Sequence, residues 1–183
     1  MDITVKRLSV ELKNDFLYFF DEVAFTDNER WSACYCQCYL ETPGDEWLQR
    51  SAETNRNAAI QRIENGAMNG FIAFDENNPV GWCHAGLKKK IKAFCDEPDG
   101  DAAVIVCFII SPKHRRKGIA TILLDYVIQT FKAEGVPYIE AYPSKDIEKQ
   151  DINYHGFFKM YQNAGFEIFN EEDDGYAVRK QLL

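Results

Sequence analysis

The pattern of apolar positions predicts a chain of alternating strands and helices. Short runs rich in β-branched and aromatic residues predict strands over residues 5–8, 70–74, 80–85, 102–110, 138–142, 166–169 and 176–182. Apolar residues at helical spacing predict helices over residues 12–25, 45–66, 120–131 and 157–164. Turn formers over residues 75–79 predict a hairpin between the second and third strands, and residues 171–175 predict another at the end of the chain.

The segment from residue 102 to residue 142 is the most informative part of this pattern. Residues 102–110 are apolar without alternation, which is typical of a strand buried on both faces, so we place this strand at the centre of the sheet. An amphipathic helix follows and ends near Gly135 and Pro137, and residues 138–142 form the next strand. The order strand, helix, strand predicts that the two strands are parallel. We therefore expect a mixed sheet covered by helices in one domain over residues 1–183.

Composition narrows the class of protein. The chain has 183 residues, 46% hydrophobic and 27% charged, which is typical of a globular protein. Its net charge of -8, from 21 basic and 29 acidic residues, argues against nucleic-acid binding, because that function needs a basic surface. The apolar run over residues 102–110 is about half the length of a membrane span. We expect a soluble cytoplasmic protein with no membrane partner and no secretory leader.

The six cysteines favour reduced thiols, because no secretory signal is visible. Cys34, Cys36 and Cys38 are spaced by two, which would place them on one face of a strand. A zinc site there would need further ligands such as Cys83 and His84, and the paired spacing typical of structural zinc is absent. Buried free thiols are the more common outcome, so no metal is expected.

A basic turn connects the central strand to the amphipathic helix. Arg115, Arg116 and Lys117 precede Gly118, where the helix begins. Helix N-termini present unpaired N–H groups, and glycine lets an anion approach the backbone. The turn therefore predicts an anion site, although neither of the common Gly-rich nucleotide loops occurs in the chain.

Two motifs resemble the GNAT superfamily of N-acetyltransferases. Arg115-x-x-Gly118-x-Ala120 resembles the superfamily's Gln/Arg-x-x-Gly-x-Gly/Ala signature, and Tyr161-x-x-x-Gly165-Phe166 resembles its later Tyr-x-x-x-Gly-Phe segment. The resemblance covers residues 70–182. It implies an α/β (α+β) fold: a central mixed, mostly antiparallel sheet with helices on both faces and a splayed parallel strand pair that forms the acetyl-CoA cleft.

The resemblance also implies a cosubstrate, acetyl-CoA, and a set of residues that contact it. Main-chain N–H groups of residues 116–120 would bind the pyrophosphate, the central strand would pair with the pantetheine arm, and its end would polarise the thioester carbonyl. Tyr161 would donate a proton to the CoA thiolate. The implied contacts are Phe108, Ile109, Ile110, Arg115, Arg116, Lys117, Gly118, Ile119, Ala120 and Tyr161.

The general base stays open at this stage. Some relatives carry Glu near the start of the central strand, where this chain has Val104, which cannot accept a proton. Glu140 lies within a predicted strand beside the cleft and is expected as a base or as an anchor for the acceptor ammonium, although a salt-bridged Glu is the alternative. His84, His155 and a water chain are the other candidates. Relatives often have Asn and Ala where this chain has Tyr154 and Phe157.

Residues 26–66 match no motif, and in relatives this region lines the acceptor side. Trp31, Tyr35 and Tyr39 are therefore expected acceptor contacts, with packing in the core as the alternative. The function expected is acetyl transfer from acetyl-CoA to a primary amine of a small-molecule or peptide acceptor, by direct attack in a ternary complex. A homodimer is common among relatives. The alternatives are a non-catalytic acyl-CoA-binding module and a metal or thiol sensor built on the cysteine cluster.

Overall fold

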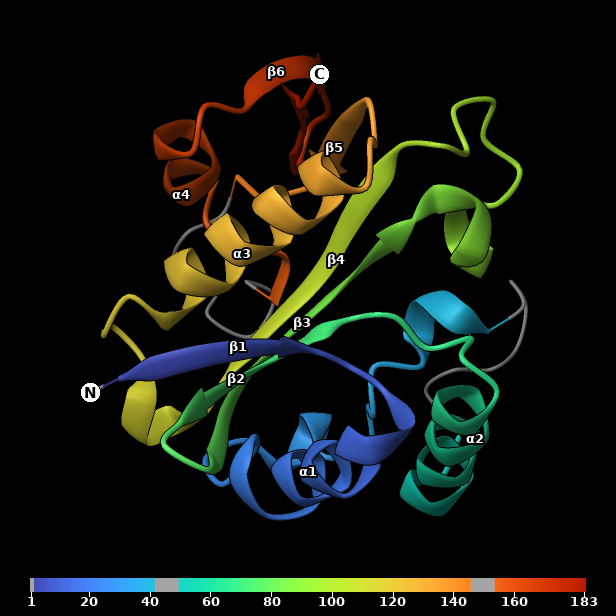
Figure 1. The fold of residues 1–183 in the computed structure, drawn as a ribbon, viewed down its shortest axis with the longest axis vertical. Helices are drawn as coiled ribbons and strands as arrows, with labels where there is room; N and C mark the ends of the chain where they lie inside the picture. The colour runs from blue at the N-terminus through green and yellow to red at the C-terminus, as the bar shows by residue number, and fades with distance from the viewer. Residues whose placement is uncertain (1, 42–49, 146–153) are drawn as a thin grey trace.

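The computed structural model describes residues 2–41, 50–145 and 154–183, and within them a seven-stranded sheet lies between two layers of helices (Figure 1). The strands are β1 (Ile3–Arg7), β2 (Phe71–Asp75), β3 (Asn78–Leu87), β4 (Ala103–Ile110), β5 (Tyr138–Ala141), β6 (Glu167–Glu171) and β7 (Tyr176–Gln181). The main helices are α1 (Lys13–Tyr18), α2 (Ala52–Glu64), α3 (Ile119–Ala133) and α4 (Phe158–Asn163). Short 3-10 and π turns connect some of them.

The strand order is β1-β2-β3-β4-β5-β7-β6, and β4 and β5 are its only parallel pair. All other neighbours are antiparallel, so the predicted mixed, mostly antiparallel sheet with β4 at its centre is confirmed. Helix α3 connects the two parallel strands, as the order strand, helix, strand predicts.

Each face of the sheet has its own hydrophobic core. On one face α3 packs on the sheet through Leu123, Val127 and Phe131, and α4 packs there through Tyr161, all of them fully buried. On the other face α1 and its π-helical continuation bury Phe16 and Phe19 against the sheet, next to α2 (Figure 1). Residues of β4 contribute to both cores, which explains why its sequence shows no alternation.

Two predicted helices differ from the observed ones. The first is a 3-10 turn (Val10–Leu12), then α1, then a π-helix (Phe19–Val23), and this change of helical period explains the mixed spacing of its apolar residues. The second helix is predicted from residue 45, but residues 45–49 lie outside the described residues. Helix α2 itself begins at Ala52, because the Ser51 hydroxyl accepts a hydrogen bond of 3.1 Å from the Thr54 N–H.

The expectation that Cys34, Cys36 and Cys38 share one face of a strand is wrong. Tyr35 and Cys36 have positive φ angles of 41° and 55°, which form a tight turn in place of an extended strand. As a result Cys36 is buried while Cys38 is exposed. None of the described helices has the length and apolar character that crossing a membrane requires.

Candidate active site

The two parallel strands separate after three residue pairs. Ile105 and Ala141 form the last pair, and β4 then continues to Ile110 without β5 beside it. At the same point the register of β4 against β3 shifts, because Ile105 pairs with Ala85 and Cys107 with His84, which leaves Val106 as an extra residue in a β-bulge. The structure therefore shows the splayed strand pair that the sequence analysis expected, and it places the bulge where the splay begins.

The β4 strand leads into the basic turn and then into α3. Gly118 is the N-cap of α3 with φ of 83°, it is exposed, and a Cβ atom built on it would meet nothing within 4 Å. The first N–H groups of α3 have no acceptor within the helix, so they point outward at the positive end of the helix dipole. Backbone here is open to an anion, and Gly118 is the residue that keeps it open.

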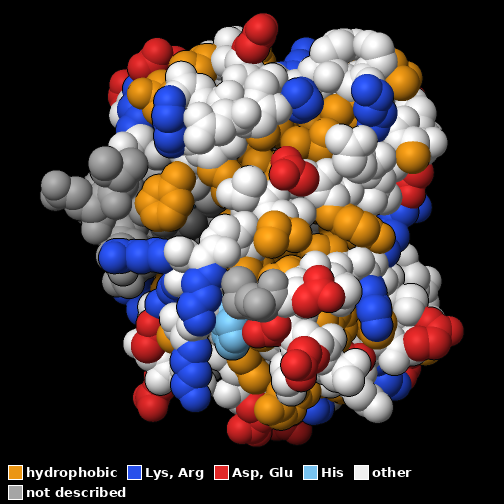
Figure 2. Space-filling view, turned by 60° about the vertical axis from the view of Figure 1, so that its left-hand side comes forward, with side chains coloured by type: hydrophobic (Ala, Val, Ile, Leu, Met, Phe, Trp, Pro, Cys, Tyr) orange, Lys and Arg blue, Asp and Glu red, His pale blue; other side chains and the backbone are white. Residues whose placement is uncertain are grey.

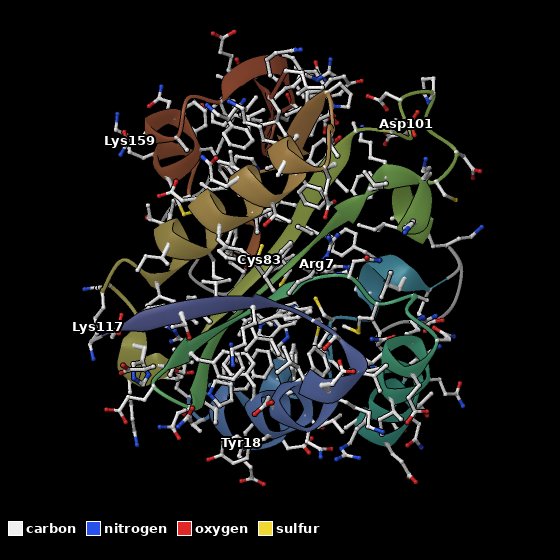
Figure 3. All side chains as sticks on the ribbon, in the orientation of Figure 1. Arg7, Tyr18, Cys83, Asp101, Lys117 and Lys159 are labelled. Atoms are coloured by element: carbon white, nitrogen blue, oxygen red, sulfur yellow. The ribbon has the colours of Figure 1, made fainter. Side chains whose placement is uncertain are left out.

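Basic side chains surround this open backbone. Lys113, Arg116 and Lys117 are exposed, and Arg116 itself has a positive φ of 60°. Figure 2 shows Lys and Arg side chains gathered in a column on the side of the molecule that carries this turn. In Figure 3 Lys117 projects from this end of β4, whereas Asp101 lies beyond the other end. The arrangement fits the expected pyrophosphate site on residues 116–120.

The Arg115 side chain stabilises the turn itself. Its Nε donates a hydrogen bond of 3.2 Å to the Ile110 carbonyl, and its guanidinium forms a bidentate ion pair with Asp27. The turn is thereby connected to the loop after the first helix.

Of the expected β4 contacts, Phe108 and Ile109 direct their side chains into the two cores, so only their main-chain groups could face a ligand.

His155 lies at the opening between β4 and β5. Its Nδ1 donates a hydrogen bond of 2.9 Å to the Val106 carbonyl, at the bulge. Because Nδ1 is the donor, the neutral ring has Nε2 as its acceptor, and Nε2 accepts a hydrogen bond of 3.1 Å from the Tyr39 hydroxyl. Burial lowers the pKa of His155, although the bond to Val106 opposes that shift. The ring is therefore neutral and presents a basic nitrogen next to the splay.

The Tyr161 side chain is fully buried beneath this histidine. Its hydroxyl donates a hydrogen bond of 2.5 Å to the main-chain carbonyl of His155, and its ring packs against Phe108 and Phe166. Burial raises the pKa of this hydroxyl well above its ordinary value. Tyr161 thus contacts the backbone that carries His155, and it does not open onto solvent.

Glu140 is placed in a closed network of charges. Its carboxylate is fully buried, it forms ion pairs with Lys88 and Arg179, and it accepts a hydrogen bond of 3.0 Å from the Tyr142 hydroxyl. Arg179 Nε donates to it at 2.6 Å. The roles of base and acceptor anchor both need an open carboxylate, whereas this one is closed by its partners. The salt-bridged alternative is what the structure shows.

Lys88 belongs to the same network. Burial lowers the pKa of its ammonium, but its hydrogen bonds to Glu140, Glu97 and Asp99 outweigh burial and raise the pKa above its ordinary value. Those three carboxylates form the only set in the described chain whose geometry could hold a metal ion. The ammonium of Lys88 contacts all three of them.

The expected acceptor contacts lie at different depths. Tyr35 is in the core, where it stacks on Phe20 and donates a hydrogen bond of 2.6 Å to Asp21; burial, and then this bond, raise its pKa to about 12. Trp31 is half-buried, packs against Tyr154, and has a buried Nε1 with no hydrogen-bond partner in the described chain. Trp31 therefore lies close to the site, whereas Tyr35 is part of the core.

Two cavities meet at Tyr154. The larger, about 310 Å³, is lined by Tyr142, Ser144, Tyr154, His155, Glu172, Asp174, Gly175, Tyr176 and Ala177. The smaller, about 40 Å³, is lined by Trp31, Cys34, Cys36, Cys38, Tyr39, Cys107 and Tyr154. The larger cavity borders His155, so an acceptor in it would reach the point where the strands separate.

Few signals in the sequence point to the residues around this larger cavity. Glu172 and Asp174 come from the turn between β6 and β7, and they are part of an acidic stretch that looks like ordinary solvated surface. Tyr154 occupies a position at which relatives often have Asn, and this departure is the one sequence signal that points to the cavity. Nothing in the sequence distinguished His155 from a structural histidine, because its partner Val106 is 49 residues away.

The comparisons with known proteins agree with this geometry. The model of the acetyltransferase (GNAT) family matches residues 26–161. The fold is similar to that of the PaiA N-acetyltransferase from Thermoplasma acidophilum in complex with coenzyme A, with a TM-score of 0.59 and 21% identity over 99% of each chain. It is also similar to an N-acetyltransferase from Staphylococcus aureus Mu50, with a TM-score of 0.62 and 16% identity over 100% of each chain.

A third similar structure is the ribosomal-protein-S18-alanine N-acetyltransferase from Escherichia coli, with a TM-score of 0.55 and 12% identity over 99% of this chain and 94% of that one. No curated protein matches the chain at a significant level. These structural likenesses concern the fold, whereas the family model matches the sequence over most of the chain, including the basic turn and Tyr161. The chain therefore belongs to the acetyltransferase (GNAT) family.

Proposed function

We propose that this protein transfers an acetyl group from acetyl-CoA to a primary amine, by direct attack of the amine in a ternary complex. The observation that carries the proposal is the run of β4 past the end of β5, from the bulge at Val106 to the open helix N-terminus at Gly118. This segment provides a free strand edge that leads directly to an anion site. A structure of similar fold contains coenzyme A, which supports this choice of cosubstrate.

The described residues fit acetyl-CoA in two places. The open backbone of residues 116–120 would bind the pyrophosphate, with Lys113, Arg116 and Lys117 adding positive charge around it. The edge of β4 beyond Ile105 would pair with the amide groups of the pantetheine arm. The bound thioester supplies the acetyl group, and main-chain N–H groups after the bulge would stabilise the charge that develops on its oxygen.

We assign the general base to His155. A protonated amine cannot attack, so a group near the splay must accept a proton. His155 is neutral, its Nδ1 is fixed by Val106, and its Nε2 is a hydrogen-bond acceptor that now receives the Tyr39 hydroxyl. In the reaction the amine would replace Tyr39 as the donor to Nε2. Glu140 is not assigned this role, because Lys88 and Arg179 neutralise it in the core.

Tyr161 acts in this proposal as a positioning residue. Its hydroxyl holds the main chain of His155 through its hydrogen bond to the carbonyl. Donation to the CoA thiolate, the role implied by the resemblance, would require this hydrogen bond to be exchanged. The two roles are distinguished below by a pH profile.

The acceptor would enter through the cavity of about 310 Å³, which joins Glu172 and Asp174 at its rim to His155. Both small-molecule and peptide amines are compatible with it, and one structure of similar fold is the NatC complex bound to Gag peptide and CoA. We place this activity in the cytoplasm, and the proposal is compatible with a homodimer. It needs neither nucleic acid nor a membrane.

The first experiment measures thermal unfolding of the protein with increasing acetyl-CoA. At a hundredfold excess over the dissociation constant, binding adds about 2.7 kcal/mol, or roughly 5–10 °C in Tm. Gly118→Glu should abolish the shift. Gly135→Glu is the matched control, since Gly135 also has a positive φ, of 75°, and open space around it, but lies at the opposite end of α3.

A shift that survives in Gly118→Glu would contradict the proposed cosubstrate site. With binding established, release of free CoA is then followed in the presence of a panel of primary amines. Turnover with a primary amine supports the transferase. Binding without turnover, over a panel of small-molecule amines and peptides, would favour the non-catalytic acyl-CoA-binding module.

A further inference from the structure

The turn that carries Cys36 is held in an unfavourable backbone conformation. Tyr35 and Cys36 are consecutive non-glycine residues with positive φ, and the Gln37 N–H closes the turn on the Cys34 carbonyl at 3.0 Å. Side chains reinforce it, because Gln37 Nε2 donates to the Tyr35 carbonyl at 2.8 Å and Arg62 donates to Gln37 Oε1. Strain that is maintained by so many contacts is characteristic of functional positions.

This turn places the Cys36 thiol between two partners from the sheet. Cys36 Sγ lies 3.4 Å from His84 Nδ1, and the Cys107 thiol adjoins it, since both cysteines line the same small cavity. His84 and Cys107 are directly opposite each other on β3 and β4. His84 Nε2 is buried and has no partner in the described chain. Two side chains that are distant from Cys36 in the sequence thus converge on its sulfur atom.

The surroundings favour the thiolate form of Cys36. Burial by itself raises the pKa of this thiol, but the hydrogen bond from Cys107 and the nearby His84 outweigh it, and the pKa is lowered well below its ordinary value. The pKa of Cys107 is raised, first by its hydrogen bond to Cys36 and then by burial. The pair therefore consists of one nucleophilic sulfur and one protonated neighbour.

Access to the pair is narrow. Cys36 and Cys107 are 3% and 5% exposed, and both line the cavity of about 40 Å³. That volume admits a molecule the size of hydrogen peroxide, because one water needs about 10–15 Å³ measured in this way. A peptide disulfide or a bulky alkylating reagent would not fit.

We propose that Cys36 and Cys107 form a redox pair that hydrogen peroxide converts to a disulfide. The Cys36 thiolate attacks one peroxide oxygen, the O–O bond breaks, and water leaves after the second oxygen takes a proton, which produces a sulfenic acid. The Cys107 thiol then attacks that sulfur, the S–O bond breaks, and a second water leaves. Two thiols are oxidised to one disulfide, and peroxide is reduced to two waters.

The pair lies where its oxidation can affect acetyl transfer. Cys107 follows Val106, whose carbonyl fixes His155. A bond between Cys107 and Cys36 would tie β4 at the bulge to the turn of residues 34–37 and close the small cavity between them. We expect peroxide to reduce acetyl transfer at least tenfold and a dithiol reductant to restore it.

The test counts thiols in the full chain after peroxide treatment, quenching and denaturation. Wild type should lose two alkylatable thiols and about 2 Da of mass, and peptide mapping should find Cys36 joined to Cys107. The Cys36→Ser variant should keep every remaining thiol reduced, whereas Cys107→Ser should lose one thiol and gain about 16 Da, because Cys36 stops at the sulfenic acid when no resolving thiol is present. Cys95→Ser is the control, since Cys95 lies outside the cavity and donates to the Lys92 carbonyl at 3.2 Å; it should lose the same pair as wild type.

Three results would overturn the proposal: no thiol lost in wild type, a mapped disulfide between other cysteines such as Cys34 and Cys36, or the same loss in Cys36→Ser. The map is made on wild type, so a variant that fails to fold does not prevent the decision. Because the thiol count needs no acetyl-CoA, failure of the redox pair and failure of the proposed transferase are separate results.

Discussion

His155 Nδ1 donates a hydrogen bond to the Val106 carbonyl at the residue where β4 bulges and its pairing with β5 has ended. The distance is 2.9 Å, and the bond fixes the tautomer that leaves Nε2 as an acceptor. The His155 ring is thus hydrogen-bonded to the first main-chain carbonyl of β4 beyond the residues that pair with β5.

His155→Asn should lower kcat for acetyl transfer by about 10²–10⁴-fold, because the Asn amide can still donate to Val106 but has no basic nitrogen. Binding of acetyl-CoA, measured by thermal shift, should persist. His114→Asn is the control, since His114 also bonds through Nδ1, to the Ser111 hydroxyl at 2.7 Å, but lies in the turn after β4. A kcat for His155→Asn close to that of wild type would contradict the assignment of the base.

The stability of the protein should fall as pH drops below about 6.5, and His155 should contribute to that fall. Burial lowers the pKa of His155 in the folded state below the ordinary value of 6.5 that it has in the unfolded chain, so the unfolded chain binds more protons in that interval. The contribution is fully present above pH 6.5 and is lost as pH falls, at no more than about 1.4 kcal/mol per pH unit.

Urea unfolding at several pH values measures this effect, and the comparison of wild type with His155→Asn isolates it from the other two histidines. As the solution is acidified below pH 6.5, the free energy of unfolding should fall more steeply for wild type than for His155→Asn. A difference that is independent of pH would show that His155 does not titrate between the two states.

Tyr161→Phe should reduce the free energy of unfolding by about 1–3 kcal/mol, because it leaves the buried His155 carbonyl without its donor. Acetyl transfer should also decrease, while the shape of the pH profile of kcat stays as in wild type, since the hydroxyl acts through His155. Denaturant unfolding and a pH–rate profile measure both effects. Selective loss of the alkaline limb in the variant would instead indicate that Tyr161 is the general acid.

Glu140→Gln should destabilise the fold by about 3 kcal/mol, because Lys88 and Arg179 would lose a fully buried counter-charge. Glu97→Gln is the matched control: Glu97 also pairs with Lys88 but its side chain is 40% exposed, so the loss should be below about 1 kcal/mol. At temperatures where both variants are folded, KM for the amine should be unchanged. A large increase in KM for Glu140→Gln alone would restore its expected role at the acceptor site.

Local sequence patterns are enough to predict the sheet, its central strand, the helix after it and the turn at Gly118. These patterns are an unbroken apolar run, helical spacing, and a glycine at a helix start. The family resemblance rested on the same local motifs. They are short in sequence and need no knowledge of which distant residues meet.

Which polar groups are partners depends on the tertiary structure. Glu140 lies on a strand where a charge looks catalytic, yet Lys88 and Arg179 close it into a buried ion network. His155 looks like any lone histidine, yet it meets Val106 at the splay. Cys36 was expected on the same face as its neighbours, and a left-handed turn separates it from them and carries it to His84 and Cys107. The physical reason is common to all three: the free energy of a buried charge or thiol depends on partners far away in the sequence, and the fold alone brings those partners together.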